Sequence, residues 1–470
     1  WNALGILVAM ASLVAIGFTA NASTLSRRGL SAATLPILWT SLYFTFSRGA
    51  WAALALGLVA MFALSTHRWG ICWALAATVP WVALDILIAA TSPALVHVGS
   101  PVRTTAPPAH RLGLALIVST LGIVCTLALS RRLETRWRPP EWPRRATVWA
   151  LSGAVCLAVI GALVTVGSPA TIAHRISNAF SDKASYRFEP TKQHAGQSLN
   201  VRLLSLSGNS RAELWRVAWD DVRGHPLLGS GAGSYAAYYL RYRSSGVAAV
   251  NANNLYLETL ADLGPLGLVA LLGGLIPPLV AAARGRGALY APAAFGAYVA
   301  FLLHASVDWD WQMPAVTLSA LMCGAVLLLV GHRDVPNWRP GRWARVIVVG
   351  GALVLAVGSL ALLRGNLAIS QSQQAASSYE WRSARTSAQT AVEWEPWSAD
   401  AWMALGEAWV GLDRPGKAAR AFRHAVRRDP GDWQTWYDLS IATSGREGRH
   451  ALAEAYRLDP RGPEPPQVTY

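Results

Sequence analysis

The sequence predicts an all-α protein: a polytopic transmembrane helix bundle with a long outer loop and a C-terminal helical-repeat domain. Of its 470 residues, 53% are hydrophobic and only 14% are charged, which is too apolar and too long for one soluble domain. About ten apolar runs approach the length that crosses a hydrocarbon core of about 30 Å. After Arg364 the chain becomes polar and repeats at a spacing of 34 residues.

The apolar runs divide the chain into four parts. The runs cover 2–20, 32–46, 50–66, 71–98, 112–130, 147–167, 258–283, 288–305, 314–331 and 346–363. We therefore predict N-terminal transmembrane helices over 1–167, an outer loop over 168–253, C-terminal transmembrane helices over 254–363 and the repeat domain over 364–470. The first run has no initiator Met and no basic leader, so it differs from a signal peptide, and we expect further helices upstream.

The positive charge predicts how the bundle is oriented. A net charge of +15 would suggest a nucleic-acid partner in a soluble protein, but here the basic residues fall on alternate loops, which the positive-inside rule places in the cytoplasm. These cytoplasmic loops carry Arg27, Arg28, Arg68, the cluster 131–145, Arg284, Arg286 and the segment 333–345. The opposite, outer side receives 47–49, 99–111, 168–253, 308–312 and the repeat domain. The partner is therefore the membrane, and we predict no nucleic acid.

Two charged residues interrupt the first helices. Arg48 lies between two runs at the outer face, where it either snorkels to the interface or binds an anion with its fixed guanidinium fork. Asp85 lies inside a span, where a charge is costly, so it faces protein or water. A polar contact between helices and a substrate role are both open for Asp85.

The outer loop contains a helix and a glycine-rich turn. Ser210 is a suitable cap for a helix that begins at Arg211, with Leu214, Trp215, Ala218 and Val222 on one face. The turn from His225 to Tyr235 includes Gly229, Gly231 and Gly233. Their free N–H groups suit a phosphate, although a tight turn uses the same residues. Arg241 follows the turn.

The polar loop becomes a membrane helix at Asn251–Gly267, NANNLYLETLADLGPLG. As structure, this is a capped helix start with Glu258 and Asp262 near the positive end of the helix dipole. As a site, Asn253, Asn254, Tyr256 and Glu258 line a polar pocket at the membrane surface. A second polar cluster, His304, Asp308 and Asp310, lies between two later spans and has the residue types of a metal site or an acid/base pair. The spacing is a weak metal signal, and we predict neither a metal nor a cofactor.

The residues after Arg364 follow the tetratricopeptide pattern. Trp402, Leu405, Gly406, Trp409, Ala418, Phe422, Ala425 and Pro430 stand at its characteristic positions. Trp402 to Trp436 and Pro396 to Pro430 are both separations of 34 residues. Such repeats form a concave surface that binds a protein partner, and these carry no catalytic constellation.

Four outer-side motifs together resemble the O-antigen ligase and polymerase superfamily of bacterial membrane glycosyltransferases. They are Ser47-Arg48-Gly49-Ala50, Arg211-x2-Leu214-Trp215-x2-Ala218, the glycine-rich turn His225–Tyr235, and Asn254-Leu-Tyr256-Leu257-Glu258-x3-Asp262-x-Gly264-x2-Gly267. The resemblance covers about residues 30–330, and some members carry a tetratricopeptide tail.

The resemblance implies transfer of a glycan from an undecaprenyl-diphosphate carrier to an acceptor hydroxyl, in cell-surface polysaccharide assembly. The protein would be a multi-pass bacterial inner-membrane enzyme with its repeats on the extracytoplasmic side. Arg48, Arg211 and Arg241 would neutralise the leaving diphosphate. The further candidate site residues are Asn253, Glu258 and His304 for catalysis and Gly231, Gly233, Asn254 and Tyr256 for substrate binding.

One position departs from the family pattern. The family usually has His where this chain has Asn253, and an amide is no general base. Either Asn253 only orients the acceptor, or His225, His304 or Glu258 is the base, or the chain is inactive. Ligase and polymerase activities are both open, and the alternatives from another class are a lipid-linked glycan transporter and a non-catalytic scaffold that recruits partners through its repeats.

Overall fold

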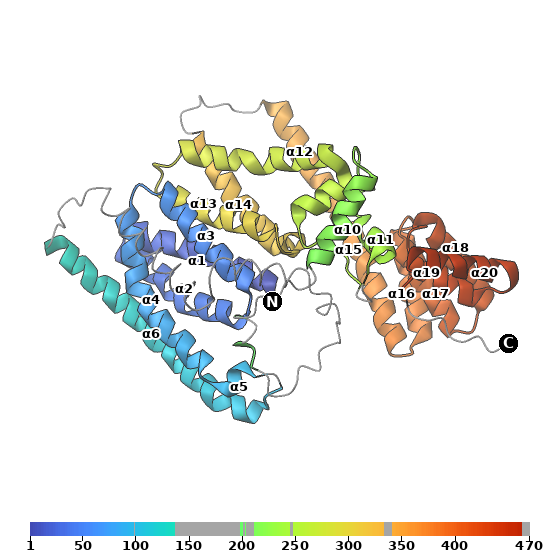
Figure 1. Cartoon of the computed structure of the whole chain (residues 1–470), viewed down its shortest axis with the longest axis horizontal. Helices are drawn as coiled ribbons and strands as arrows, with labels where there is room; N and C mark the ends of the chain where they lie inside the picture. The colour runs from blue at the N-terminus through green and yellow to red at the C-terminus, as the bar shows by residue number, and fades with distance from the viewer. Residues whose placement is uncertain are drawn as a thin grey trace. The chain divides into compact units, whose positions relative to one another are not determined.

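The computed structural model describes residues 1–97, 99–136, 198–200, 203, 211–244, 248–332 and 341–462 (Figure 1). Its regular elements are helices, and the described residues contain one isolated β-bridge, between His97 and Ser198, and no strand. The all-α prediction is therefore confirmed. The chain divides into a first compact unit, 1–235 with 251–334, and a second compact unit, 236–250 with 335–470.

The first unit is the helix bundle. Its elements, in chain order, are α1 (Asn2–Asn21), α2 (Leu25–Phe44), α3 (Arg48–Leu64), α4 (Arg68–Ala90), α5 (Pro93–Val96), α6 (Val102–Arg136), α10 (Arg211–Gly224), the start of α11 (Tyr235–Tyr242), α12 (Leu255–Arg284), α13 (Ala291–His304), the 3₁₀ turn η2 (Asp310–Gln312) and α14 (Pro314–Gly331).

Small residues let α1, α3 and α13 pack closely at the centre of this bundle. A Cβ on Gly57 of α3 would lie 2.8 Å from the carbonyl oxygen of Gly296 on α13, and a Cβ on Gly17 of α1 would lie 2.3 Å from the Cβ of Ala293. Helices in a membrane associate through such close backbone approaches, because lipid gives them no hydrophobic drive to associate. The crossing fixes the start of α3 beside the end of α13.

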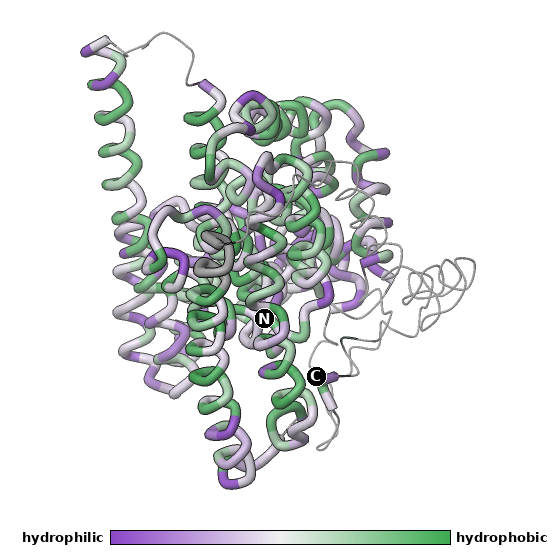
Figure 2. Tube along the Cα trace, turned by 90° about the vertical axis from the view of Figure 1, so that its left-hand side faces the viewer, coloured by the Kyte–Doolittle hydropathy of each residue, from purple (hydrophilic) through white to green (hydrophobic). Residues whose placement is uncertain are grey.

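Candidate membrane spans account for much of the bundle and for the first helix of the C-terminal unit. In the described part of the chain, six helices are long and apolar enough to cross a membrane: α1, α4, residues 102–129 of α6, α12, α14 and α15 (Arg342–Ser377). The helices α3 and α13 are shorter apolar helices. Hydrophobic residues predominate along these helices in Figure 2. The predicted span 147–167 lies outside the described residues, and α2 begins at polar residues well before the predicted run 32–46.

α12 is broken near its start. Gly264 has φ 66° and ψ −171°, and Pro265 follows it. A positive φ of this kind suits glycine, which has no Cβ, and a Cβ at Gly264 would lie 2.5 Å from the carbonyl oxygen of Leu227. The break therefore separates a short helix, 255–263, which carries the carboxyl groups of Glu258 and Asp262, from a longer apolar helix, 265–284.

The second unit contains the C-terminal helices. They are α15 (Arg342–Ser377), α16 (Trp381–Trp394), α17 (Ala399–Gly411), α18 (Pro415–Arg428), α19 (Trp433–Ala442) and α20 (Gly445–Leu458), and each packs on the next. The predicted last span, 346–363, is the first part of α15, which continues without a break into the segment that packs on α16. This continuity is why that span belongs to the second unit rather than to the bundle.

The predicted 34-residue period recurs in the hydrogen bonds of the second unit. The indole N–H of Trp402 donates to the carbonyl oxygen of Pro396 at 3.0 Å, and that of Trp436 donates to Pro430 at 3.0 Å. A Cβ on Gly406 would lie 2.4 Å from the ring of Phe422, so a glycine is needed where α17 meets α18. Assignment of these helices to the tetratricopeptide family stays a prediction.

Candidate functional site

An ion pair joins the start of α10 to the loop after α13. The Nη2 of Arg211 lies 2.9 Å from Asp308 Oδ2, and its Nε donates to the carbonyl oxygen of Val307 at 2.5 Å. Asn2 of α1 also donates to Asp308 Oδ2, at 2.7 Å. The side chain of Asp308 is 3% exposed and that of Arg211 is 17% exposed, so the guanidinium is held in place but retains contact with solvent.

His304 connects the end of α13 to the start of α3. Its Nδ1 lies 2.9 Å from Asp310 Oδ1, and both side chains are fully buried. A Cβ on Gly49 would lie 2.9 Å from His304 Nε2, so the glycine that follows Arg48 makes room for the imidazole. Among the described residues, His304 Nε2 has no hydrogen-bond partner. An acceptor hydroxyl has no access to this buried histidine in the structure.

The cluster His304, Asp308 and Asp310 therefore divides between two tasks. Asp308 accepts hydrogen bonds from Arg211 and Asn2, whereas Asp310 is hydrogen-bonded to His304. The described residues contain no group of three or more His, Cys, Asp or Glu side chains that could hold a metal ion. The geometry favours a structural role, in which this turn positions the starts of α3 and α10.

The start of α12 is held by a network of polar bonds. Asn254 is the N-cap, and its Oδ1 accepts from the N–H groups of Tyr256 and Leu257 at 3.1 and 3.0 Å. Glu258 Oε2 accepts from the N–H of Ala252 at 2.7 Å, and Tyr256 Oη donates to the carbonyl oxygen of Leu302 at 2.9 Å. Such reciprocal bonds satisfy the free N–H groups of a helix start.

Asn253 differs from its neighbours. Within the described residues its amide has no hydrogen-bond partner, and the side chain is partly exposed. Its φ of 52° is left-handed, a conformation that Asn tolerates better than most residues do. The backbone turn thus presents a polar side chain whose donors and acceptor are available to a ligand.

An internal carboxylate fills the glycine-rich turn. Asp262 Oδ2 accepts from the N–H of Gly233 at 2.8 Å, and Asp262 Oδ1 accepts from the N–H of Tyr235 at 3.0 Å. The N–H of Gly231 donates to the carbonyl oxygen of Asp262 at 2.9 Å. The turn does bind an anion through its backbone, but in this structure that anion is Asp262.

His225 is the first residue of the same turn. Its Nδ1 is 2.9 Å from Asp221 Oδ1, and Ser230 Oγ donates to Asp221 Oδ2 at 2.7 Å. The His225 side chain is 48% exposed and that of Asp221 is fully buried. The N–H of Ser230 donates to the carbonyl oxygen of Ala261, which is six residues along α12 from its first residue, Leu255, roughly 9 Å at 1.5 Å per residue.

The structure brings most of the predicted site residues to one end of the bundle. Leu255 N–H donates to the carbonyl oxygen of Ala305 at 2.8 Å, and Gln312 Nε2 lies 3.5 Å from Glu258 Oε1. Asn253, Asn254, Tyr256 and Glu258 therefore adjoin the turn that holds His304 and Arg211, and Arg48 begins the helix next to His304. Arg241 belongs to the second unit, where it is exposed and lies over the ring of Tyr242 at 5.3 Å.

Sequence reasoning missed the partners of these residues. The sequence made Asp308 a candidate metal ligand or acid/base group. In the structure it is the counter-ion of Arg211, 97 positions away. Asp262 was a helix-start residue and is the ligand of the glycine-rich turn. The Asp-x-Asp spacing of Asp308 and Asp310 was the one available signal for a structured turn.

Comparison with known proteins gives one match. Residues 109–272, about a third of the chain, match the family model described as O-antigen ligase. The matched range includes Arg211, the glycine-rich turn and the start of α12. Comparisons with curated proteins and with solved structures found no match.

Proposed function

We propose, from the match of residues 109–272 to the O-antigen ligase family model, that the chain is a member of the O-antigen ligase and polymerase superfamily that moves a glycan from an undecaprenyl-diphosphate carrier to an acceptor hydroxyl. The reaction takes place at the outer face of the bacterial inner membrane, in cell-surface polysaccharide assembly. The C-terminal repeats are on the same, extracytoplasmic side and recruit a protein partner there.

One observation carries the proposal: Arg48 and Arg211 adjoin the same turn. Arg211 bonds Val307 and Asp308, and His304, in the preceding residues, packs against Gly49 beside Arg48. A departing lipid diphosphate develops negative charge, which preorganised guanidinium groups stabilise. Asp308 orients Arg211 without burying it.

Asn253 supports the acceptor side of the proposal. Its amide, which has no partner among the described residues, can accept from the attacking hydroxyl and so orient it, but it cannot take the proton as a base does. The acceptor oxygen forms a bond to the anomeric carbon while the bond from that carbon to the carrier phosphate oxygen breaks. The diphosphate leaves with the electron pair, and the hydroxyl proton passes to the diphosphate or to solvent.

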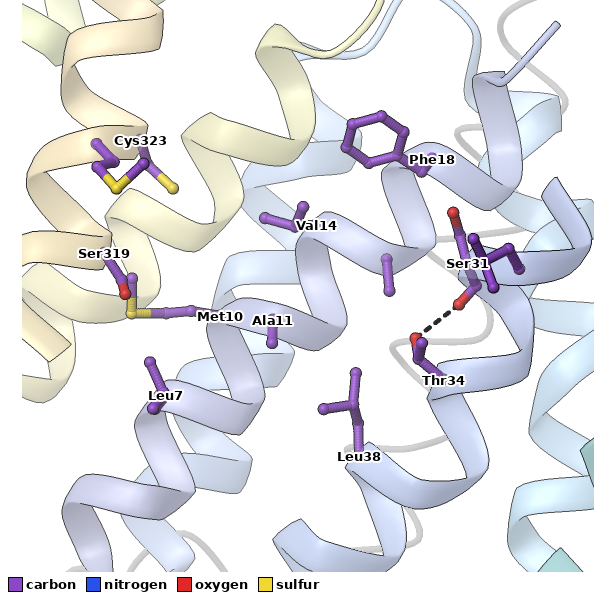
Figure 3. Close-up of a pocket in the computed structure, with 13 residues that line it drawn as sticks. Leu7, Met10, Ala11, Val14, Phe18, Ser31, Thr34, Leu38, Ser319 and Cys323 are labelled. Carbon is purple, nitrogen blue, oxygen red and sulfur yellow. Dashed lines mark hydrogen bonds between the residues drawn. The ribbon is translucent and has the colours of Figure 1, made fainter. Parts of the chain in front are cut away.

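An apolar groove in the bundle suits the carrier's polyprenyl chain. It has a volume of about 630 Å³ and is lined by residues of α1, α2 and α14. Figure 3 shows Leu7, Met10, Val14 and Phe18 along α1 facing Leu38 of α2 and Cys323 of α14. The groove begins on α1 five residues after Asn2, which contacts Asp308, and so leads away from the proposed diphosphate site.

Transfer in vitro from a purified undecaprenyl-diphosphate glycan tests the proposal. We expect Arg211→Ala to lower the rate by about 10²- to 10³-fold, as loss of a charge-stabilising donor does. Arg223→Ala is the matched control, because Arg223 is an exposed arginine on the same helix. Activity in the Arg211→Ala variant equal to that of the wild type would overturn the diphosphate role.

The Asn253→His variant distinguishes the remaining interpretations of the site. If the wild type transfers glycan, Asn253 acts as an orienting residue. If the wild type is inactive and the Asn253→His variant is active, the chain has lost its general base. If the wild type and the Asn253→His variant both fold but neither transfers glycan, the result favours the non-catalytic scaffold. A ladder of product lengths identifies a polymerase, and a single addition identifies a ligase.

A further inference from the structure

A polar cavity, separate from the apolar groove, lies at the other end of the bundle. Its volume is about 370 Å³, and its lining includes Asn21, Arg28, Thr66, His67, Arg68 and Trp69. All of these residues belong to the first unit. None of the described residues that line it is acidic.

The helices show that this cavity and the candidate active site lie at opposite ends. α1 runs from Asn2, which contacts Asp308, to Asn21, which lines the cavity. Its 20 residues span roughly 30 Å, about the thickness of the hydrocarbon core. α3 likewise starts at Arg48 and ends at Leu64, just before Thr66. If the candidate active site faces outward, this cavity faces the cytoplasm, where the positive-inside rule also places Arg28 and Arg68.

The positive charge in the cavity has no carboxylate counter-ion within the part of the chain that the structure describes. Arg28 Nε donates to the carbonyl oxygen of Ala22 at 2.7 Å. Arg68 Nη2 makes a long contact, 3.5 Å, with the carbonyl oxygen of Ala63, and the guanidinium lies over the ring of Phe62 at 5.3 Å. Both arginines are partly buried, so solvent screens them less than it screens an exposed arginine.

A helix start adds to this positive field. α4 begins at Arg68, and its N-cap residue His67 makes no side-chain hydrogen bond to the helix. The first N–H groups of a 23-residue helix therefore point toward the cavity end with the positive end of the dipole. At the rim, Trp69 is 51% exposed and Leu289, which also lines the cavity, is 43% exposed, as residues at a membrane interface often are.

We propose that this cavity binds the phosphate of an anionic lipid headgroup from the cytoplasmic leaflet. Arg28 and Arg68 supply the charge, the start of α4 supplies N–H donors, and Trp69 with Leu289 contacts the glycerol and acyl region. Basic cavities between transmembrane helices on this side of a membrane are suited to such headgroups. Free inorganic phosphate shares the chemistry and differs in having no acyl chain.

Native mass spectrometry of the full-length protein in detergent tests the site. The probes are phosphatidylglycerol, phosphatidylcholine and inorganic phosphate. We expect the wild type to retain phosphatidylglycerol in preference to phosphatidylcholine, and the Arg28→Gln/Arg68→Gln variant to bind it at least tenfold more weakly. Arg27→Gln is the matched control: Arg27 precedes Arg28 but is exposed and does not line the cavity.

Because Arg28 also bonds the end of α1, Arg68→Gln alone is the second variant. It loses the long contact to Ala63 and the contact with the Phe62 ring, both within its own loop and the preceding helix, so we expect it to fold and still to weaken retention several-fold. Equal retention by the wild type and Arg68→Gln, or no preference for phosphatidylglycerol, would refute the proposal. Displacement of phosphatidylglycerol by millimolar inorganic phosphate would assign the cavity to free phosphate and overturn the lipid assignment.

Discussion

Arg211 Nη2 lies 2.9 Å from Asp308 Oδ2, and this pair holds α10 against the turn that follows α13. Removing one partner leaves the other charge in a largely buried place. Breaking such a pair typically costs about 3 kcal/mol or more, unlike an exposed pair. Within the bundle, the pair is thus a structural joint as well as a candidate part of the site.

We therefore predict that Asp308→Ala lowers thermal stability in detergent by several degrees, and that Arg211→Ala does so too. Because both remove the same contact, the double variant should be less destabilised than the sum of the two single variants. Additive effects in this double-mutant cycle would show that the pair contributes no coupling. Arg223→Ala, at an exposed position near the end of α10, should leave the melting temperature unchanged.

Gly49→Ala should disturb the site through His304. The added Cβ would meet His304 Nε2 at 2.9 Å, closer than real Cβ atoms approach, so the imidazole or the start of α3 must shift. We expect at least a tenfold loss of glycan transfer. In a His304→Ala background the same substitution should have little further effect, because the obstacle is gone. Gly113→Ala, where a Cβ meets nothing within 4 Å, is the control for glycine replacement on a helix.

Asp262→Ala should release the glycine-rich turn. The N–H groups of Gly233 and Tyr235 lose their acceptor, and a buried unsatisfied polar group costs about 1–3 kcal/mol. We expect faster proteolysis within 225–235, measured by mass spectrometry of the fragments. If millimolar phosphate restores protection in Asp262→Ala but has no effect on Asp262→Asn, the emptied turn is an anion site. Unchanged proteolysis would show that Asp262 does not hold the turn.

The C-terminal unit should lose stability as pH rises from about 4 to about 7. Burial, together with the nearby carboxylates Glu407 and Asp432, raises the pKa of Asp438 from 3.8 to about 7. The folded state therefore keeps a proton that the unfolded chain releases above its lower pKa, so the stabilising proton is lost as pH increases through this window. Asp438→Asn should flatten the pH dependence of the free energy of opening that hydrogen-exchange protection reports in α19.

The control for that measurement is Asp413→Asn, because Asp413 is exposed between α17 and α18. Its hydrogen-exchange profile should follow the wild type at every pH. If the wild type and Asp438→Asn have the same pH dependence, the buried carboxyl does not determine stability in this range.

Local patterns made much of the fold predictable from the sequence. Asn254 caps α12 and Ser47 caps α3, as their positions before apolar runs suggest. The 34-residue spacing of Trp402 and Trp436 reappears as two equal hydrogen bonds. These features depend on residues near one another in the chain.

Features that depend on distant residues could not be predicted. The buried face of α10 includes Glu213, Val217 and Asp221, whereas the apolar pattern placed Trp215 and Val222 on it. Leu214 and Ala218 are buried as predicted, whereas Trp215 and Val222 are only partly buried, because the helix also packs against polar groups: buried Asp221 bonds Ser230 and His225. Asp85 likewise bonds Ser119 across two helices. No single-sequence pattern reveals such pairings.

The broken helix α12 reconciles a polar motif with a membrane span. The 20 residues after Gly264 extend about 30 Å, so they alone are long enough to cross the hydrocarbon core. The carboxyl groups of Glu258 and Asp262 precede that stretch and need never enter lipid. A straight, unbroken helix of the same sequence would have to shift along the bilayer normal by two or more helical turns, or tilt, to keep its apolar part in the bilayer. One glycine thus lets a short, largely buried helix that carries two carboxyl groups and a lipid-embedded helix be neighbours in the chain.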